Sequence, residues 1–399
     1  MKIIQINCVY AIGSTGKIVE DISNYCISKG DDVFVLYGRQ GKNITSNIMK
    51  VSSELEAKIH SVKSRLTGLD FSYSTIATKR ALNFIKSYKP DVVHLHCLNG
   101  HFINVYKLVR FLKQEKIPTI LTLHAEIMHT AGCEHAYDCM KWVEGCYGCD
   151  KIKGYLTRIY RDDSKLAYSK MKESFDGFEN IAIVSVSKWL ENRAKQSAIF
   201  RHCHAKFITI ENGLDLQSFV PLNINPLKEK FDGKNPIVLH VTPNFNHPLK
   251  GGKYVIELAK KHPEWSFIIV GYNGDITLPS NVTTVGHTKN KEELSWYYNI
   301  ADVTLLTSKR ETFSMVCAES LACGTPVVGF RAGGPESVFI GDFARFVDYG
   351  DVRELGEAIN EMITLSPKID TTLINKKFSA KDMATKYRQL YKEIIKKKK

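Results

Sequence analysis

The fold is decided by the stretch Ser308-Lys309-Arg310-Glu311-Thr312-Phe313-Ser314-Met315-Val316-Cys317-Ala318-Glu319. An apolar, β-branched run at 302–307 precedes it and predicts a buried strand. A helix is predicted to begin near Met315 and to end at Gly324, and a second buried strand follows at Val327-Val328. The stretch is therefore the loop and helix of a strand–loop–helix–strand unit. One carboxylate, Glu311, lies in the loop, and another, Glu319, lies in the helix.

The start of this predicted helix is suited to binding a phosphate group. A helix N-terminus offers unpaired N–H groups and the positive end of the helix dipole, so the backbone of Phe313, Ser314 and Met315 is a natural anion site. A carboxylate beside an anion is unfavourable unless it binds something else, and the hydroxyl groups of a sugar or a ribose fit that role. The plain alternative is that each glutamate is a solvated surface residue.

A resemblance to a known family extends this interpretation. Glu-x7-Glu, then Ala322-Cys323-Gly324-Thr325-Pro326-Val327-Val328 and Gly333-Gly334-Pro335-Glu336, resembles the donor-site signature of the family-4 retaining glycosyltransferases. The resemblance implies a GT-B fold and a nucleotide-diphosphate sugar as donor, UDP-linked or GDP-linked. It also implies that Glu319 binds the ribose, that the amides at 313–315 and Lys250 bind the diphosphate, and that Glu311, as a catalytic residue, binds the transferred sugar.

Length and composition are consistent with a two-domain globular protein. The chain has 399 residues, 44% of them apolar and 24% charged, and two domains are the prior for this length. The net charge of +13 favours an anionic partner: nucleic acid, a phosphate-bearing substrate or an acidic membrane surface. No run approaches the ~18 apolar residues that cross a bilayer, and residues 1–8 predict a first strand rather than a signal peptide. We therefore expect a cytoplasmic protein whose ten cysteines are mostly reduced.

Apolar strands alternate with amphipathic helices along the whole chain, which predicts α/β architecture with two parallel, Rossmann-like sheets facing each other across a cleft. The first half has predicted strands at Lys2–Cys8, Asp32–Gly38, Asp91–His96, Pro118–His124, Ile181–Ser187 and Lys206–Glu211. The second has them at Ile237–Val241, Ser266–Gly271, Val282–Val285, Val303–Thr307, Pro326–Phe330 and Arg345–Val347. The segment 46–73 fits this alternation poorly and is predicted to be a mobile loop with one helix.

Three domains or segments follow from this pattern. Residues 1–221 form an acceptor-side domain, residues 222–378 form a donor domain, and residues 379–399 form a helix with a polybasic end. In the family that the chain resembles, such a helix packs back onto the first domain.

Two predicted site residues lie in the first half. Gly13-Ser14-Thr15-Gly16-Lys17 is neither a Walker A loop nor Gly-x-Gly-x-x-Gly. It matches the glycine loop that the family places over the donor diphosphate, and Gly16 is the residue carried over, because a missing side chain lets the backbone approach a phosphate. His124 ends a predicted strand and matches a histidine beside the donor sugar, although a lone histidine is more often structural. We expect it, as a second catalytic residue, to bind the donor sugar through a hydrogen bond rather than to act as a base. Many relatives continue with Asp, where this chain has Ala125 and Glu126.

The second half adds a lysine and a glycine to the predicted donor site. Lys250 enters a helix, where a lysine can hold a diphosphate as a point charge. Relatives usually carry an Arg a few residues earlier, but residues 240–247 contain none, so Lys250 is expected to act alone or with Arg310 or Lys309. Gly271 follows a strand, in a loop that borders the nucleotide base in the family.

Four cysteines, Cys133, Cys139, Cys146 and Cys149, form a Cys-rich insert at 133–149. Four close thiols in a reducing compartment suggest a structural zinc site, while free thiols or two disulfides remain alternatives. No Asp-x-Asp triplet occurs, so no metal cofactor is expected for catalysis.

The predicted function is that of a retaining, metal-independent glycosyltransferase. It transfers a sugar to a hydroxyl of a glycan or polyprenyl-diphosphate-linked acceptor in bacterial surface polysaccharide synthesis. Loose contact with an anionic membrane through Lys396–Lys399 is expected, against the alternative of a frayed, solvated end. The rival functions are a GT-B nucleotide-sugar epimerase and a basic nucleotide- or nucleic-acid-binding protein. The second is disfavoured because the positive charge is scattered and no RNA-binding motif occurs.

Overall fold

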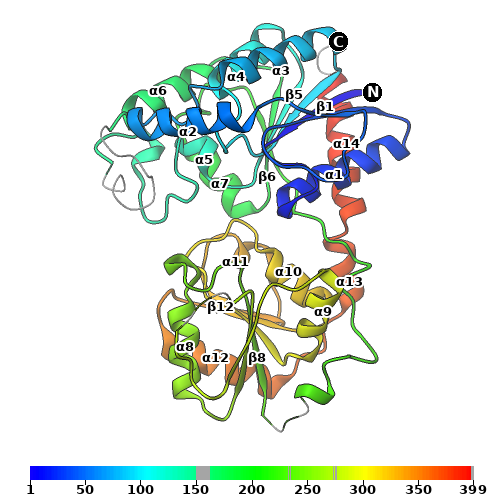
Figure 1. The fold of residues 1–399 in the computed structure, drawn as a ribbon, viewed down its shortest axis with the longest axis vertical. Helices are drawn as coiled ribbons and strands as arrows, with labels where there is room; N and C mark the ends of the chain where they lie inside the picture. The colour runs from blue at the N-terminus through cyan, green and yellow to red at the C-terminus, as the bar shows by residue number, and fades with distance from the viewer. Residues whose placement is uncertain (150–161, 232, 234, 273, 275, 397–399) are drawn as a thin grey trace. The chain divides into compact units, whose positions relative to one another are not determined.

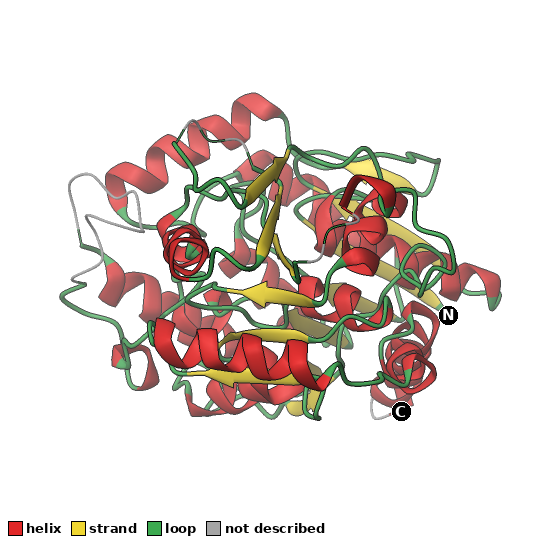
Figure 2. Ribbon diagram, turned by 90° about the horizontal axis from the view of Figure 1, so that it is seen from below, coloured by secondary structure: helices red, strands yellow, loops and turns green. Residues whose placement is uncertain are grey.

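The computed structural model describes residues 1–149, 162–231, 233, 235–272, 274 and 276–396. The chain forms two compact units, Met1–Glu211 together with Met383–Lys399, and Asn212–Asp382. Each unit is an α/β layer structure, and Figures 1 and 2 show helices flanking the strands. Among the described residues, no helix combines the length and the apolar content that crossing a bilayer requires.

Unit 1 contains a parallel sheet of seven strands in the order β3-β2-β1-β4-β5-β6-β7. The strands are β1 (Lys2–Asn7), β2 (Asp32–Tyr37), β3 (Ile48–Lys50), β4 (Val92–Leu95), β5 (Thr119–Leu123), β6 (Ile181–Ser185) and β7 (Lys206–Thr209). The α-helices are α1 (Gly13–Ser28), α2 (Glu54–Thr67), α3 (Thr75–Tyr88), α4 (Val105–Gln114), α5 (Ile127–Thr130), α6 (Ser164–Phe175) and α7 (Lys188–Gln196), with a 3-10 turn at η1 (Lys141–Val143).

Two details of unit 1 differ from the sequence predictions. The segment 46–73 contains the edge strand β3 as well as helix α2, so it is not a loop with one helix. The prediction missed β3 because three half-buried residues give no periodic pattern. In addition, α1 begins at Gly13, so the predicted glycine loop forms the first turn of a helix.

Unit 2 contains a parallel sheet of six strands in the order β10-β9-β8-β11-β12-β13. The strands are β8 (Ile237–Val241), β9 (Ser266–Val270), β10 (Val282–Val285), β11 (Val303–Leu306), β12 (Val327–Phe330) and β13 (Ala344–Val347). The helices are α8 (Gly252–Lys261), α9 (Lys291–Ile300), α10 (Met315–Ala322), α11 (Pro335–Val338), α12 (Val352–Leu365) and α13 (Thr371–Lys377), with 3-10 turns at η2 (Glu229–Phe231) and η3 (Pro248–Lys250). Helices α8 and α12 pack with the sheet in one apolar core.

The last helix, α14 (Ala380–Lys396), packs with α1 in the core of unit 1. Tyr387 and Tyr391 are buried there, and their hydroxyls lie 3.1 Å from Thr122 Oγ1 and 2.7 Å from His94 Nδ1. Arg388 Nε donates to Asp31 Oδ2 at 2.6 Å. The end of the chain is therefore part of the first unit in space, while Lys397–Lys399 of the predicted basic patch lie outside the described residues.

Candidate functional site

The candidate site residues of unit 2 all follow the carboxyl ends of parallel strands, so they lie at one edge of its sheet. Lys250 follows β8, Gly271 follows β9, and the stretch 307–315 follows β11. The loop after β8 and the loop after β11 are connected by hydrogen bonds. Thr307 Oγ1 donates to the carbonyl of Lys250 at 2.7 Å, and the amide of Lys309 donates to the carbonyl of Leu249 at 2.8 Å.

Glycine is required where these loops touch. At Gly251, φ is +72° and an added Cβ would lie 2.2 Å from the carbonyl oxygen of Thr307. At Gly271, φ is +87° and a Cβ would lie 1.8 Å from the carbonyl oxygen of Thr242. Both conformations and both close approaches exclude other residues. Gly271 therefore has a structural reason to be glycine, independent of any contact with a nucleotide base.

Glu311 is held by the loop that follows β12. Its amide donates to the carbonyl of Ala332 at 3.0 Å, and its own carbonyl accepts from the amide of Gly334 at 2.9 Å. A Cβ on Gly334 would lie 2.1 Å from the carbonyl oxygen of Thr312. Glu336, the last residue of the recognised motif, accepts from the amides of Ala332 and Gly333 at 3.1 and 2.8 Å. The Gly-Gly-Pro-Glu segment is therefore the support that fixes the Glu311 backbone.

The side chains of Lys250 and Glu311 pair with each other. Lys250 Nζ lies 2.7 Å from Glu311 Oε1, and both side chains are partly exposed. The sequence had suggested separate ligands for these two residues, a diphosphate and a sugar. These two residues are 61 positions apart in the chain, and the structure brings them together in one ion pair.

The N-terminus of α10 has a strained backbone. Ser314, its N-cap, has φ of +75°, which is uncommon for a residue with a side chain, and its Oγ accepts from the amide of Cys317 at 3.4 Å. Phe313 is buried edge-on against Phe339 and Phe378. These contacts hold the 313–315 backbone at the helix end that the sequence predicted as an anion site. Arg310 is half-buried in the same loop.

Glu319, one turn further along α10, accepts a hydrogen bond from the buried hydroxyl of Tyr298 at 2.9 Å. Tyr298 is held in turn, because its carbonyl accepts from Thr325 Oγ1 at 2.6 Å. Glu319 as a whole is half-buried, but its carboxyl group is desolvated, and this raises the pKa of Glu319 to about 7. The Tyr298 hydrogen bond and the charge of Lys291 act in the opposite direction and lower that pKa. Tyr298 was not predicted, because one tyrosine in an amphipathic helix carries no motif.

The two candidate residues of unit 1 also lie at a carboxyl edge, since Gly16 follows β1 and His124 follows β5. A Cβ on Gly16 would lie 3.1 Å from the amide nitrogen of Ala11, whose N–H donates to the Gly16 carbonyl. This close turn is a structural reason for the glycine. Lys17 pairs with Glu20 and Asp21 at 2.8 and 2.9 Å.

A buried hydrogen-bond chain lies behind His124. Ser23 Oγ donates to the carbonyl of Val19 at 2.8 Å, so the hydroxyl is an acceptor for Gln5 Nε2 at 2.7 Å. Gln5 Nε2 also points to the Val19 carbonyl, which fixes the amide orientation and leaves Gln5 Oε1 as the acceptor from His96 Nε2 at 2.9 Å.

This chain assigns the tautomer of His124. Burial holds the pKa of His96 well below its ordinary value, so the ring carries one proton, at Nε2, and its Nδ1 accepts. The group 3.3 Å from His96 Nδ1 is His124 Nε2, which must then be the donor. Burial also lowers the pKa of His124 to about 4. His124 is therefore neutral, with Nδ1 as the acceptor nitrogen of its ring.

Glu126, which stands near the position of the usual Asp, is a buried structural residue. Its Oε1 accepts from Arg193 Nε at 2.6 Å and its Oε2 accepts from the amide of Ala136 at 2.8 Å. The guanidinium group of Arg193 lies over the rings of Trp142 and Trp189. Glu126 thus ties the start of the Cys-rich insert to α7.

The structure does not assemble the four cysteines of the insert into a metal site. None of the four forms a disulfide bond, and among the described residues no three His, Cys, Asp or Glu side chains are grouped so as to hold a metal ion. Cys146 Sγ instead lies 3.6 Å from the carbonyl of Thr130. The zinc site remains a prediction, and metal analysis of protein purified without a His-tag tests it: a zinc-to-protein ratio near zero would contradict it.

Comparison with known proteins gives matches over most of the chain. Residues 15–218 match the family model described as Glycosyltransferase Family 4, and residues 224–378 match that described as Glycosyl transferases group 1. The chain is 21% identical over 368 residues, or 89% of each chain, to WcaC of Escherichia coli (strain K12), named as a colanic acid biosynthesis glycosyl transferase.

Two solved structures share the fold of this chain. Sucrose-phosphate synthase from Thermosynechococcus elongatus has a TM-score of 0.67 at 16% identity and covers 99% of both chains. Anabaena Alr3699/HepE in complex with UDP-glucose has a TM-score of 0.65 at 15% identity, over 98% of this chain and 100% of that one. These likenesses confirm the predicted GT-B fold.

Proposed function

Because this chain belongs to glycosyltransferase family 4, as the resemblance of its donor-site motif predicted, we propose that it transfers a sugar from a nucleotide-diphosphate sugar to a hydroxyl of a glycan or lipid-linked acceptor. The observation that carries the proposal is the pairing of Lys250 with Glu311 at the carboxyl edge of the unit 2 sheet. A cation that can bind a diphosphate and a carboxylate that can accept from hydroxyl groups therefore lie side by side at this edge.

The proposed donor contacts use the residues of this edge. Glu319 accepts from the ribose hydroxyls, Lys250 and the amides at 313–315 bind the diphosphate, and Glu311 accepts from hydroxyls of the transferred sugar. Arg310 adds a positive charge from the same loop. When the donor binds, its diphosphate takes the place of Glu311 beside Lys250, which turns the carboxylate toward the sugar.

The proposed reaction retains the anomeric configuration. The bond between the sugar C1 and the diphosphate oxygen breaks, and the acceptor oxygen forms the new bond to C1 on the same face. The acceptor proton goes to the leaving phosphate, so no protein base is needed. Lys250 and the positive end of α10 stabilise the charge that develops on the diphosphate. On unit 1, His124 is proposed to accept a hydrogen bond from the sugar through Nδ1, and Gly16 to let the backbone approach the donor.

The names of the similar proteins support the class of donor and pathway. HepE was solved with UDP-glucose, and the name of WcaC assigns it to colanic acid biosynthesis. We therefore propose a UDP-sugar as donor, with a GDP-sugar as the alternative to be screened, and a role in bacterial surface polysaccharide synthesis at the inner face of the membrane. A polyprenyl-diphosphate-linked glycan fits this role as acceptor.

A thermal-shift screen of nucleotide sugars tests the proposal. A true donor at about 100 times its dissociation constant should stabilise the protein by about 2.7 kcal/mol. The same donor should stabilise Glu319→Ala by only about 0.4–1.4 kcal/mol, because losing hydrogen bonds to a charged group costs about 1.5–3 kcal/mol, roughly 10–100-fold in affinity. Glu292→Ala, which changes an exposed glutamate of α9, is the matched control and should respond like wild type.

Product analysis then separates transfer from the rival functions. Transfer consumes the acceptor and releases a nucleoside diphosphate. Release of an epimerised nucleotide sugar without any acceptor would identify an epimerase instead. Salt-dependent binding to RNA without affinity for any nucleotide sugar would identify a nucleic-acid-binding protein.

A further inference from the structure

Helix α2 of unit 1 exposes a row of large apolar side chains to solvent. The exposed fractions are 69% for Leu55, 47% for Ile59, 57% for Val62 and 46% for Leu66. Their spacing of four, three and four residues places all four within about 60° of one another around the helix axis. We call these four residues the α2 stripe.

The α2 stripe lies opposite the side of the helix that packs on unit 1. The buried residues of α2 are Ala57, His60 and Ser64, which fall about half a turn away from the stripe. The helix is therefore already anchored by its inner side, and the stripe contributes nothing to that packing. Scattered exposed apolar residues need no explanation, but an aligned row of four indicates a binding surface.

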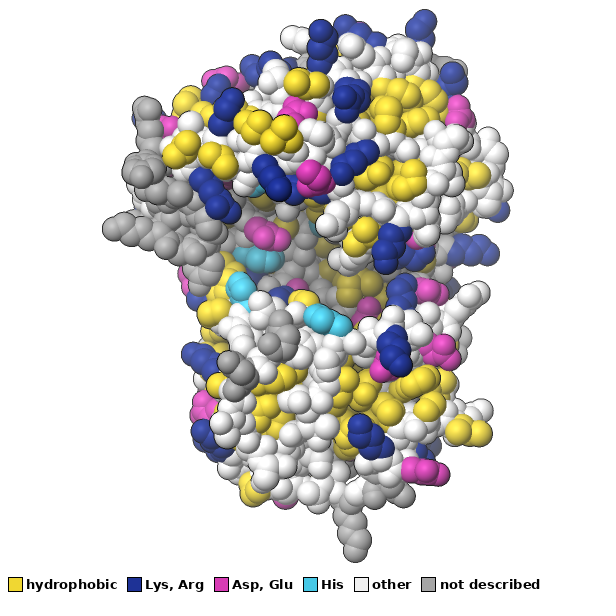
Figure 3. Space-filling view, viewed as in Figure 1, with side chains coloured by type: hydrophobic (Ala, Val, Ile, Leu, Met, Phe, Trp, Pro, Cys, Tyr) yellow, Lys and Arg dark blue, Asp and Glu magenta, His cyan; other side chains and the backbone are white. Residues whose placement is uncertain are grey.

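Positive charge flanks the α2 stripe on both sides. Lys58 and Arg65 lie along one border and Lys63 along the other, and all three are exposed. Figure 3 shows apolar side chains over α2 with Lys and Arg side chains among them.

The two glutamates of α2 are engaged elsewhere. Glu54 pairs with Lys50 and Arg39 at 2.8 and 3.1 Å. Glu56 Oε1 accepts from the amides of Ile76 and Ala77 at 3.0 Å each, at the start of α3. Both acidic side chains of α2 are therefore bound to residues outside the helix. The charged residues that border the stripe, Lys58, Lys63 and Arg65, are all basic, which suits an anionic partner.

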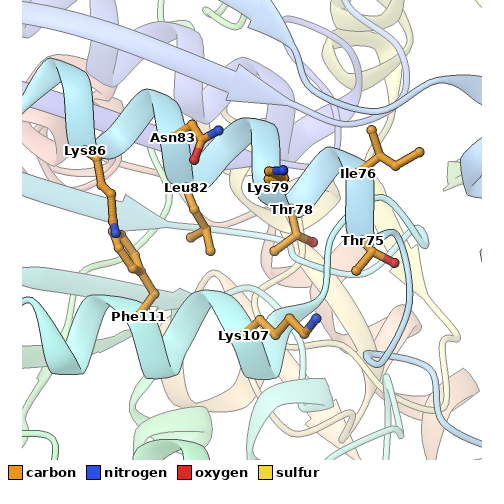
Figure 4. A pocket seen from close by; sticks show the side chains of 9 residues that line it. All are labelled: Thr75, Ile76, Thr78, Lys79, Leu82, Asn83, Lys86, Lys107 and Phe111. Carbon is orange, nitrogen blue, oxygen red and sulfur yellow. The ribbon is translucent and has the colours of Figure 1, made fainter.

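A basic pocket lies between α3 and α4, and Glu56 of α2 binds the start of α3. Ile76, whose amide binds Glu56 of α2, is 68% exposed and lines a pocket of about 610 Å³. Lys79, Lys86 and Lys107 line the same pocket, and Phe111 and Leu82 form part of its apolar wall (Figure 4). The pocket thus repeats the composition of the stripe, apolar carbon bordered by ammonium groups.

We propose that the α2 stripe and the lysines around it are a docking surface for a bilayer that contains anionic lipid. The apolar side chains enter the acyl boundary while the flanking cations bind lipid phosphates, the arrangement of a helix that lies in a membrane interface. A protein partner would need acidic side chains around an apolar groove, whereas an anionic bilayer supplies both features over its whole surface. The surface goes beyond the transfer reaction and depends on none of the donor contacts.

Flotation with vesicles tests the surface in the full chain. Wild type should float with phosphatidylcholine vesicles that contain phosphatidylglycerol, float poorly with pure phosphatidylcholine, and lose binding as salt is added. Changing the four stripe residues to serine should lower binding to anionic vesicles by about ten-fold or more. Changing Lys58, Lys63 and Arg65 to glutamine should weaken it by about five-fold for each charge.

Matched controls separate the stripe from other exposed residues. Ile224→Ser, Ile340→Ser and Leu373→Ser together remove three exposed apolar side chains of unit 2 and should leave flotation unchanged. Removal of residues 396–399 tests the basic end, and should have a smaller effect than the stripe variant. The proposal would be overturned if the stripe variant floated as well as wild type. It would also be overturned if flotation were lost only in the chain that lacks residues 396–399.

Two further readouts keep the result unambiguous. A nucleotide-sugar thermal shift on every variant shows that unit 2 is intact, so failure of the docking surface and failure of the donor assignment are distinguished. Sedimentation equilibrium without vesicles detects self-association. If wild type formed a dimer but did not bind vesicles, and the stripe variant did not form the dimer, the surface would belong to a second copy of the chain. That result would overturn the proposal.

Discussion

Lys250 Nζ and Glu311 Oε1 are 2.7 Å apart, so the cation proposed to bind the diphosphate is paired with the carboxylate proposed to bind the sugar. Both side chains are partly exposed, so the pair by itself contributes little to stability. Its consequence is for binding. A nucleoside diphosphate must displace the carboxylate from Lys250, whereas a nucleotide sugar displaces it and also gives it hydroxyl groups to accept from.

The first prediction distinguishes the two residues by ligand. Lys250→Met should weaken both UDP and a UDP-sugar about 10–100-fold, because one charge-assisted hydrogen bond to phosphate is lost. Glu311→Gln should weaken the UDP-sugar but bind UDP as tightly as wild type or more tightly, because the competitor for Lys250 is removed. Isothermal titration of each variant with both ligands measures the difference.

Lys309→Met is the control for the loss of a positive charge from the neighbouring loop, which follows β11. It should change the affinity for UDP less than Lys250→Met does. Equal losses of UDP affinity in Glu311→Gln and Lys250→Met would contradict the assignment of the two side chains to different parts of the donor.

The second prediction concerns pH and Glu319. Burial raises the pKa of Glu319 to about 7, so the folded protein keeps this proton up to neutral pH, while the unfolded chain releases it near 4.5. The contribution of Glu319 to stability therefore falls as pH rises from about 4.5 to about 7. Donor binding has the opposite dependence, because only the ionised carboxylate can accept from the Tyr298 hydroxyl and from two ribose hydroxyls together.

Affinity for a nucleotide sugar should therefore rise with pH up to about 7, by at most about ten-fold per unit, and then level off. A nucleotide sugar is the right probe because its diphosphate has no terminal phosphate that titrates in this range. In Glu319→Gln the affinity should be lower and nearly independent of pH. A wild-type affinity that is flat between pH 5.5 and 8 would contradict ionisation of Glu319 on binding.

Much of the fold could be predicted because its strands are continuous apolar runs. Twelve strands were expected and each has a counterpart, since most of them are runs of buried apolar or β-branched residues, which leave a clear pattern. The exception, β3, has only the half-buried residues Ile48, Met49 and Lys50. An edge strand this short is defined by its pairing with β2 and not by its own composition.

The pairings within the candidate site could not be predicted from local sequence. Lys250 and Glu311 are 61 positions apart, and only the adjacency of β8 and β11 in the sheet brings their loops together. The same holds for Gln5, which lies in β1, and His96, which directly follows the adjacent strand β4. The sequence indicated which residue types could bind a nucleotide sugar, while the strand order determines which of them meet.

The third prediction is that transfer does not need a divalent cation. The chain has no Asp-x-Asp triplet, and Lys250 with the amides at the start of α10 is proposed to supply the positive charge that a cation supplies elsewhere. Turnover in EDTA should stay within about two-fold of turnover without it, since no charge next to the diphosphate is removed. Complete loss in EDTA that Mn²⁺ or Mg²⁺ restores would show that a cation binds the diphosphate.

The fourth prediction concerns Gln5, which contacts His96 and reaches His124 only through it. Gln5→Met removes the acceptor that keeps the His96 proton at Nε2, so His96 can change tautomer and His124 is no longer required to donate from Nε2. The transfer rate should fall about ten-fold, the equivalent of one misplaced hydrogen bond, while the affinity for UDP should not change, because the UDP contacts are proposed on unit 2.

Tyr391→Phe is the matched control, because it removes another buried hydrogen bond, to His94, whose ring lies against that of His96. Both variants should lower the melting temperature, but only Gln5→Met should change the His124 tautomer. Nitrogen-15 spectra of the histidine rings, with the His124 signals assigned from His124→Asn, read the tautomer directly. If Gln5→Met and Tyr391→Phe lowered the rate equally and the His124 spectrum stayed the same, Gln5 would be a packing residue, and the Nδ1 acceptor of His124 would not depend on it.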